Sequence, residues 1–180
     1  MEAKTDRRIK ITKRLLKDAF TEMLKEKDIY HISIRELCEK ADVNRTTFYK
    51  YYGNQFDLLD EMENDLLRSI EETFNEENID EARGIEKILL FLEKDIDFTR
   101  LLLNSSVDAE FPNKLFSLAT VARTVEKTMA NIPLQEREYI HRFMLYGAYE
   151  IIRTWVNKDN RESAKEMSII ILNRFLLNIK

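Results

Sequence analysis

The sequence is short of the residues that make turns and covalent cross-links. Its 180 residues include 3 glycines, 2 prolines and 1 cysteine. Because sheets need frequent turns, and turns depend on glycine and proline, this shortage predicts long helices joined by short loops. The single cysteine, Cys38, excludes an intrachain disulfide and a cysteine zinc cluster, and it favours a reducing cytoplasm as the setting.

Long apolar runs are also missing. Runs such as residues 88–92 are far shorter than the stretch of about 18 uncharged residues that a membrane helix requires, and no early run resembles a signal peptide. Hydrophobic residues make up 44% of the chain and charged residues 34%, which predicts a soluble globular protein. We therefore expect a cytoplasmic protein with no membrane contact.

Motifs typical of catalysis are absent as well. The two histidines, His31 and His141, lie far apart in the sequence, and no zinc-protease, nucleophile-elbow or phosphate-loop motif occurs. The carboxylates at 93–97 lack the spacing of a calcium loop. We expect no enzyme activity, no cofactor and no metal.

The charge is divided unevenly along the chain. Residues 1–53 carry 13 Lys+Arg against 9 Asp+Glu, a net +4, whereas the remainder carries 16 against 24, a net −8. A local basic region suits binding to nucleic-acid phosphates, and an acidic body limits non-specific binding elsewhere. A solvated lysine-rich helix face would explain the charge equally well.

Apolar residues recur at helical spacing over most of the chain and predict an all-α fold of about nine helices. The spacing places helices at 8–25, 34–41, 44–51 and 54–75, with Ile11 and Leu15 on the buried face of the first. Gly53 is expected to end the third helix in a left-handed conformation. Further helices are expected near 82–94, 98–102, 112–129, 134–157 and 164–178. The polar run after residue 75 suggests two domains, 1–53 and 76–180, linked by helix 54–75.

Residues 33–52 have the pattern of a helix-turn-helix. Ser33 and Glu36 form a capping box, Asp42 and Val43 form a tight break, and Asn44 caps a short helix. Such a unit needs an apolar inner face, here Leu37, Ala41, Val43, Phe48 and Tyr52, and an outer face that can approach bases. An ordinary helical hairpin with a polar exterior is the competing interpretation.

The outer face predicts the DNA contacts. We expect Arg45 to bind guanine bidentately, Thr46 to contact a thymine methyl group or a phosphate, and Arg35 to reach the groove edge. The hydroxyl groups of Thr47 and Tyr51 should bond phosphates. Tyr49 and Lys50 can contact either bases or phosphates.

The stretch ISIRELCEKADVNRTTFYKYYGNQFDLLDEM resembles the DNA-binding domain of the tetracycline-repressor (TetR) family of bacterial transcription regulators. The resemblance covers about residues 7–62, and TTFYKYY is its sharpest part. It implies that residues 1–53 form a three-helix DNA-binding domain. The matching positions are Ser33, Leu37, Ala41, Val43, Asn44, Thr47, Phe48, Tyr49, Tyr51, Tyr52, Leu58 and Leu59.

Three positions depart from the family pattern. Asp42 stands where a glycine is usual and must tolerate a left-handed conformation. Gln55 replaces a lysine, which weakens a phosphate contact expected there, although the backbone N–H groups of that helix start can still bind phosphate. Cys38 replaces a small alanine, and we interpret it as core rather than as a redox sensor. The predicted DNA-binding set is thus Arg35, Asn44, Arg45, Thr46, Thr47, Tyr49, Lys50, Tyr51 and Gln55.

We expect the protein to form a homodimer through residues 76–180, because one helix-turn-helix covers only a single half-site of a near-palindromic operator. The apolar stripes of the last two helices are the predicted interface, and the C-terminal stretch resembles the dimer region of many such regulators from Gram-positive bacteria. Alternatively, both stripes face their own core. The stripe residues are Ile140, Phe143, Met144, Gly147, Ile151, Ile152, Trp155, Val156, Met167, Ile170, Ile171, Phe175, Leu176 and Ile179.

The resemblance also implies a small-molecule effector that releases the DNA, but the sequence singles out no ligand-binding residue. We predict a repressor rather than an activator. A regulator switched by a partner protein, and a helical interaction adaptor that does not bind DNA, are the alternatives.

Overall fold

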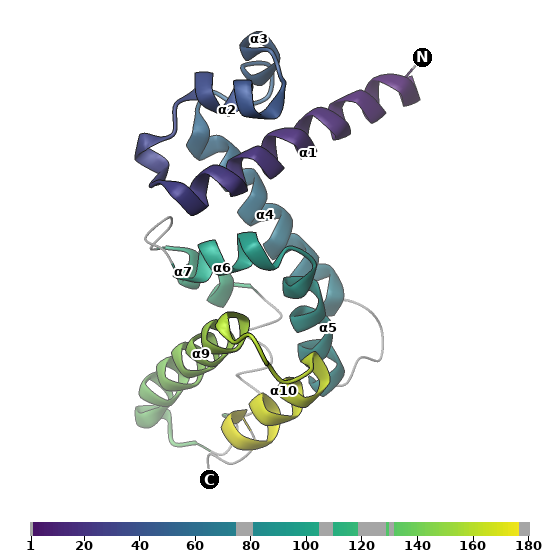
Figure 1. Ribbon diagram of the computed structural model, residues 1–180. Coiled ribbons are helices and arrows are strands. Elements are labelled where there is room, and N and C mark those ends of the chain that lie inside the picture. The colour runs from purple at the N-terminus through teal and green to yellow at the C-terminus, as the bar shows by residue number, and fades with distance from the viewer. Residues whose placement is uncertain (1, 75–80, 105–109, 119–128, 130–131, 177–180) are drawn as a thin grey trace. The chain divides into compact units, whose positions relative to one another are not determined.

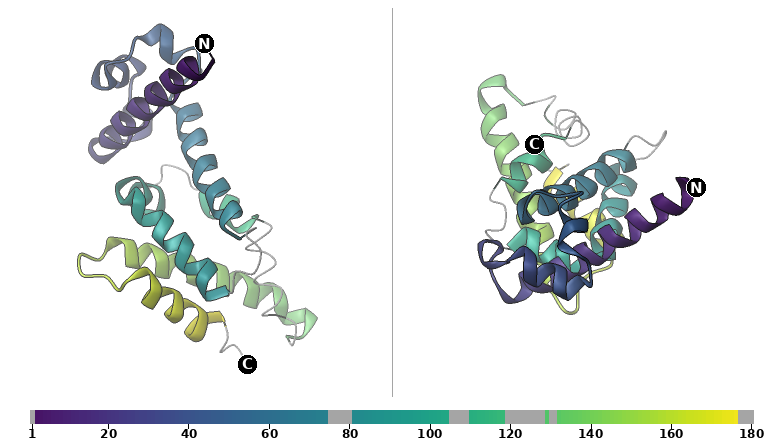
Figure 2. Two further views of the ribbon diagram at one scale, coloured as in Figure 1. Left: turned by 90° about the vertical axis from the view of Figure 1, so that its right-hand side faces the viewer. Right: turned by 90° about the horizontal axis from the view of Figure 1, so that it is seen from above.

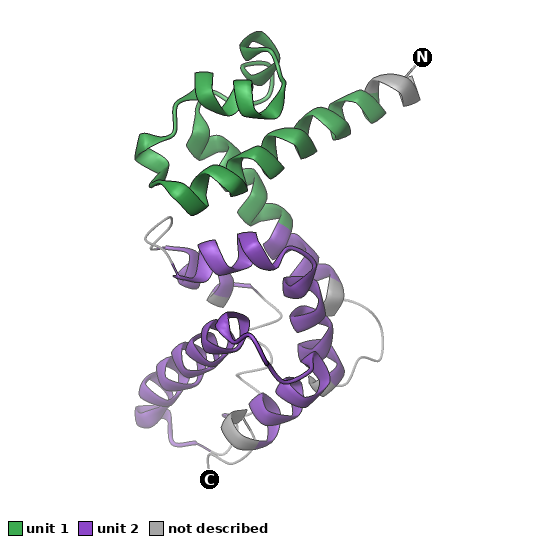
Figure 3. Ribbon diagram, viewed as in Figure 1, with its two compact units in different colours: residues 1–65 green, residues 66–180 purple. Residues whose placement is uncertain are grey.

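The structure, a computed structural model, describes residues 2–74, 81–104, 110–118, 129 and 132–176. These residues contain nine α-helices and no strand (Figure 1), which confirms the all-α prediction. The chain forms two compact units, residues 1–65 and 66–180 (Figure 3). The division between them lies within one helix, α4 (Gln55–Phe74).

The first unit contains α1 (Glu2–Glu26), the 3₁₀ turn η1 (Ile29–His31), α2 (Ile34–Ala41), α3 (Arg45–Phe48) and the first half of α4. α1 packs beside α2 (Figures 1 and 2). Its core contains the fully buried side chains of Leu16, Phe20, Leu37, Phe48 and Leu58.

The prediction that Ile11 and Leu15 are buried was wrong. Their side chains are 44% and 39% exposed. The N-terminal turns of α1 extend past the helices that cover the rest of it (Figure 1), so the apolar spacing continues beyond the core.

Local capping chemistry agrees with the sequence. The Ser33 hydroxyl accepts from the Glu36 N–H, and the Glu36 carboxylate accepts from the Ser33 N–H, which completes a capping box. Asp42 ends α2 in the left-handed region with φ 51° and ψ 44°. The Asn54 side chain accepts from the N–H groups of Phe56 and Asp57 at 2.8 and 3.1 Å, as expected for the cap of α4.

The third helix is shorter than predicted. α3 spans four residues, after which the chain continues in hydrogen-bonded turns up to the Tyr52 N–H, which donates to the Phe48 carbonyl at 3.0 Å. The β-branched Thr46 and Thr47 and the aromatic residues after them favour helix weakly.

Gly53 does not adopt a positive φ, contrary to the prediction. Its N–H donates to Asp57 Oδ2 at 2.7 Å, and an added Cβ would lie 3.0 Å from that same oxygen. The glycine therefore allows a carboxylate to approach the backbone closely, rather than permitting a left-handed turn.

The second unit contains α5 (Glu81–Lys94), α6 (Ile96–Asn104), α7 (Phe111–Phe116), α9 (Leu134–Asn157), α10 (Ala164–Ile170) and the π-helical η2 (Ile171–Leu176). α10 packs on α5, and α6 packs on α9 (Figure 2). The indole N–H of the fully buried Trp155 donates to the Glu162 carbonyl at 2.7 Å.

The boundaries in this unit differ from the predicted ones in two places. α7 ends at Phe116, and residues 119–128 of the predicted helix 112–129 lie outside the described residues. The last helix is α-helical only to Ile170, after which η2 continues in π geometry. No helix among the described residues is both long enough and apolar enough to cross a membrane.

Candidate nucleic-acid interface

A tightly packed inner face fixes α3. Phe48 is fully buried and Tyr52 is 3% exposed, and their ring centroids lie 5.4 Å apart. Leu37 and Ala41 of α2 are buried with them, while Val43 is half-buried. Four of the five residues predicted for the inner face are thus buried, and they hold α3 against α2.

The turn between the two helices is held by its own backbone. The Asp42 N–H donates to the carbonyls of Cys38 and Glu39, and the Val43 N–H donates to Cys38 at 2.9 Å. Asn44 then caps α3 through its side-chain oxygen, which accepts from the Thr46 N–H at 2.8 Å. The Asn44 oxygen is thereby committed to the helix, and its amide NH₂ is the part that can contact a ligand.

The outer face of this segment is polar and accessible. Arg45, Thr46, Tyr49 and Lys50 are exposed, and Thr47 is half-buried. The Tyr49 ring packs edge-on against Phe48 at 5.5 Å yet remains 58% exposed. The outer residues are therefore carried by a rigid helix while their polar ends remain free to meet a ligand.

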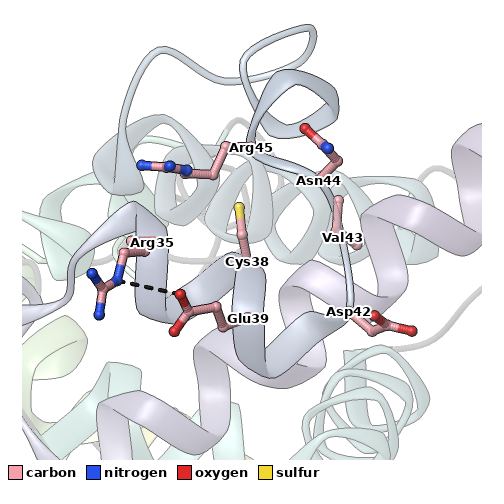
Figure 4. Close-up of a pocket in the computed structure, with 7 residues that line it drawn as sticks. All are labelled: Arg35, Cys38, Glu39, Asp42, Val43, Asn44 and Arg45. Carbon is pink, nitrogen blue, oxygen red and sulfur yellow. Dashed lines mark ion pairs between the residues drawn. The ribbon is translucent and has the colours of Figure 1, made fainter.

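A cleft of about 360 Å³ separates α2 from α3 (Figure 4). It brings together three of the predicted contacts, Arg35, Asn44 and Arg45. The cleft is also lined by Cys38, Glu39, Asp42 and Val43.

The sequence analysis did not identify Glu39, whose carboxylate lies within 3.2 Å of the Arg35 Nε (Figure 4). Both side chains are well exposed, at 70% and 65%, so the pair contributes little to stability. It leaves the terminal nitrogens of Arg35 available and places a carboxylate that could accept from cytosine N4. The i, i+4 spacing of the two residues was the available signal.

Cys38 lines the same cleft as Arg35 and Arg45 and is 3% exposed (Figure 4). Burial raises the pKa of its thiol, an effect that the charge of Arg45 opposes. A buried, protonated thiol is a poor nucleophile, which fits a core role.

Gln55 is less available than the other predicted contacts. It is half-buried, and its side-chain NH₂ makes a long hydrogen bond of 3.5 Å to the Ile29 carbonyl. Asn54 already occupies the N–H groups of Phe56 and Asp57. The start of α4 therefore has fewer free donors for a phosphate than the sequence suggested.

A charged network anchors the C-terminal end of the helix-turn-helix. The Tyr52 hydroxyl donates to Glu61 of α4 at 3.1 Å, and the ammonium groups of Lys13 and Lys17 from α1 lie 2.5 and 2.9 Å from the same carboxylate. Lys17 also contacts Asp65 at 2.6 Å. We call these residues the Glu61 network.

The electrostatics of the Glu61 network are favourable. Burial alone would raise the pKa of Glu61, but hydrogen bonds from Lys13 and Lys17 hold that pKa below its ordinary value. The Lys13 ammonium also lies 5.6 and 5.5 Å from the ring centroids of Tyr51 and Tyr52. One carboxylate thus links α1, α4 and the chain that follows α3.

Comparisons with known proteins agree with this geometry. Residues 80–175, more than half of the chain, match the TetR family model described as "Transcriptional regulator C-terminal region". An uncharacterized HTH-type transcriptional regulator of Bacillus subtilis (strain 168), YxbF, is 26% identical over 161 residues, which are 85% of this chain; the match spans 42% of that protein's length.

Two solved structures share the fold. A TetR transcriptional regulator from Streptococcus agalactiae 2603V superposes with a TM-score of 0.71 at 23% identity, over 98% of this chain and 99% of that one. The dihydroxyacetone kinase operon activator DhaS gives 0.62 at 20% identity, over 93% and 96%. With the match over residues 80–175, these findings show that the chain belongs to the TetR family of transcriptional regulators.

Proposed function

We propose that this protein binds a near-palindromic DNA operator as a homodimer and represses transcription from it. The observation that carries the proposal is the outer face of α3, where Arg45, Thr46, Tyr49 and Lys50 are exposed on a helix whose inner side is locked by Phe48. A short helix presented in this way fits the major groove.

Base reading is assigned to the start of α3 and phosphate binding to its surroundings. Arg45 is the candidate for bidentate contact with guanine, and Arg35 lies on the same cleft. The hydroxyls of Thr47, Tyr49 and Tyr51 are candidates for phosphate contacts, which set register without reading sequence.

An exposed aromatic stripe on α9 supports a dimer. Tyr139, Phe143 and Tyr146 are 75%, 66% and 47% exposed, at the i, i+4, i+7 spacing of one helix face. The opposite face is buried in the protomer, including Met144, Trp155 and Val156, which the sequence analysis had placed in the interface stripe.

The neighbouring groove extends this surface. A groove of about 380 Å³ between α9 and α10 is lined by Phe143, Gly147, Ile151 and Met167, among others. An added Cβ on Gly147 would meet nothing within 4 Å in the protomer. The space over Gly147 is therefore open to a helix of a second copy, as an interface through the last two helices requires.

We assign DNA binding to residues 1–53, linkage to helix 54–75, and dimerisation with effector binding to residues 76–180. A small-molecule effector would release DNA only by its differential affinity for two states of the dimer. Repression needs no further contact, since a dimer bound over a promoter excludes polymerase.

The proposal is tested by selecting duplexes from a random pool with the pure protein. We expect two related half-sites whose centres lie roughly 34–36 Å, or a multiple of that, apart. Arg45→Ala should weaken operator binding by about 1–3 kcal/mol and should relax the base preference at one position of each half-site. Lys25→Ala is the control, because Lys25 is an exposed lysine of α1 that is paired with Glu22. This variant should change neither the affinity for the operator nor the base preference.

Two results would count against the proposal. A chain that selects no sequence even at low salt does not bind an operator. An equal loss for Arg45→Ala on all duplexes would show that Arg45 contacts phosphate only.

A further inference from the structure

The cations of α1 whose side chains the structure describes fall into two groups. Lys13 and Lys17 are paired with Glu61 and Asp65, and Lys25 is paired with Glu22. A second group, nearer the N-terminus, is exposed and makes no ion pair with any residue that the structure describes. This second group, Arg7, Arg8, Lys10 and Arg14, is called the α1 basic tip.

The basic tip forms a continuous surface. At 100° per residue, Arg7, Lys10 and Arg14 fall within about 60° of one another around the helix. They lie on the side opposite the buried Leu16 and Phe20. Their Cα atoms span roughly 10 Å of the helix axis.

The basic tip is accompanied by little negative charge. Asp6 is the one acidic residue between positions 6 and 17. The α1 lysines that face α4 form ion pairs with carboxylates of α4, so their charge holds the two helices together within the unit. The unpaired charge is therefore concentrated at one end of α1 and is available to an external anion.

The position of the basic tip within the first unit indicates which anion this is. Figures 1 and 2 place the N-terminal turns of α1 beyond α2, at the same end of the unit as α3. Along one strand of B-DNA the charges repeat about every 3.4 Å of axis, so a 10 Å row of cations spans about three phosphates.

We propose that the basic tip binds backbone phosphates of the DNA flanking each half-site, outside the bases that α3 reads. This inference rests on the proposed operator binding and extends the footprint of each protomer. Because phosphate contacts carry no sequence information, the flank would add affinity and salt dependence without adding a base preference.

The test compares the triple variant Arg7→Gln, Lys10→Gln, Arg14→Gln with wild type, using fluorescence anisotropy at several salt concentrations. Two duplexes are used: the selected operator with long flanks, and the same operator trimmed to its half-sites. Each lost phosphate contact should lower the slope of log K against log salt by about 0.9. On the long duplex we expect the slope to fall by about 2–3 for each protomer, and on the trimmed duplex wild type and variant should coincide.

Two controls separate charge and folding from the contact itself. Lys25→Gln removes one exposed charge from the other end of the same helix and should leave the slope unchanged. Since the three substituted side chains are exposed, the variant should melt at the wild-type temperature.

The outcomes distinguish this inference from the proposed function. If wild type binds the operator but the variant keeps the full slope on the long duplex, the flank contact is wrong and operator binding stands. A difference that persists on the trimmed duplex places the contact inside the half-site and overturns the inference. If wild type binds no duplex, both proposals fail. If the variant instead loses binding to anionic lipid vesicles while its binding to both duplexes is unchanged, the basic tip binds a membrane and the inference is overturned.

Discussion

Asp42 occupies a conformation that suits glycine, and replacing it gives a quantitative test. Its φ of 51° places it in the left-handed region, where it ends α2 and accommodates the turn to α3. An L-residue pays roughly 1–2 kcal/mol there, and aspartate somewhat less than most. Glycine avoids this strain but has more freedom to lose from the unfolded chain. We expect Asp42→Gly to stabilise the protein by about 0.5–1 kcal/mol.

Asp42→Ala is the matched control, because it removes the same charge and keeps a Cβ. It should be less stable than Asp42→Gly by about 1–2 kcal/mol, the full left-handed penalty. For a chain of this size, 1 kcal/mol corresponds to roughly 2–4 °C in Tm, which thermal unfolding resolves. Equal m-values in urea unfolding would show that the variants differ in stability and not in the surface exposed on unfolding. If the alanine variant is as stable as the glycine variant, residue 42 is not strained and the explanation of the turn is wrong.

Four further predictions concern other parts of the chain. Glu61→Gln should destabilise by about 1–3 kcal/mol in urea unfolding because it removes the negative charge and one of the two oxygens that accept from three donors; a loss no larger than that of Asp65→Asn would contradict a network centred on Glu61. Gly147→Leu should keep the protomer folded while weakening the dimer in sedimentation, since the added side chain meets open space in the protomer; an intact dimer would place the interface elsewhere. Hydrogen bonds from Ser33 and then Lys27 lower the pKa of Glu36 from 4.5 to about 2, so the stability that Glu36→Gln loses should be present above pH 4.5 and vanish as pH falls through 2; a gap independent of pH would refute this. Tyr49→Phe should weaken operator binding in anisotropy measurements if its hydroxyl meets a phosphate, and unchanged affinity would remove that role.

Local chemistry was readable from the sequence. The capping box at Ser33, the Asn44 cap and the left-handed Asp42 each depend on residues within four positions of one another. These features follow from neighbouring atoms, so tertiary context does not decide them.

Features set by distant residues, or by the rotamers of nearby side chains, were missed. Periodicity placed Ile11 and Leu15 in a core that ends before it reaches them. Gly53 looked like a left-handed terminator, but Asp57 determines its role. In the candidate site, the outer face of α3 was predictable. The i, i+4 spacing of Arg35 and Glu39 permits their pairing but does not require it, because the contact also depends on the side-chain rotamers.

The charge of the DNA-facing unit shows why segment sums mislead. Residues 1–53 have a net charge of +4. Residues 54–65 add no cation and five carboxylates, at positions 57, 60, 61, 63 and 65, so the net charge of residues 1–65 is −1. That total would argue against a nucleic-acid partner. However, Glu61 and Asp65 are paired with the lysines of α1, and Glu63 is 1% exposed. These three charges contribute little to the field outside the unit, whereas the arginines at positions 7, 8, 14, 35 and 45 are exposed. A phosphate responds to local potential rather than to net charge, so a unit of −1 can still present a cationic surface on the side that carries α3.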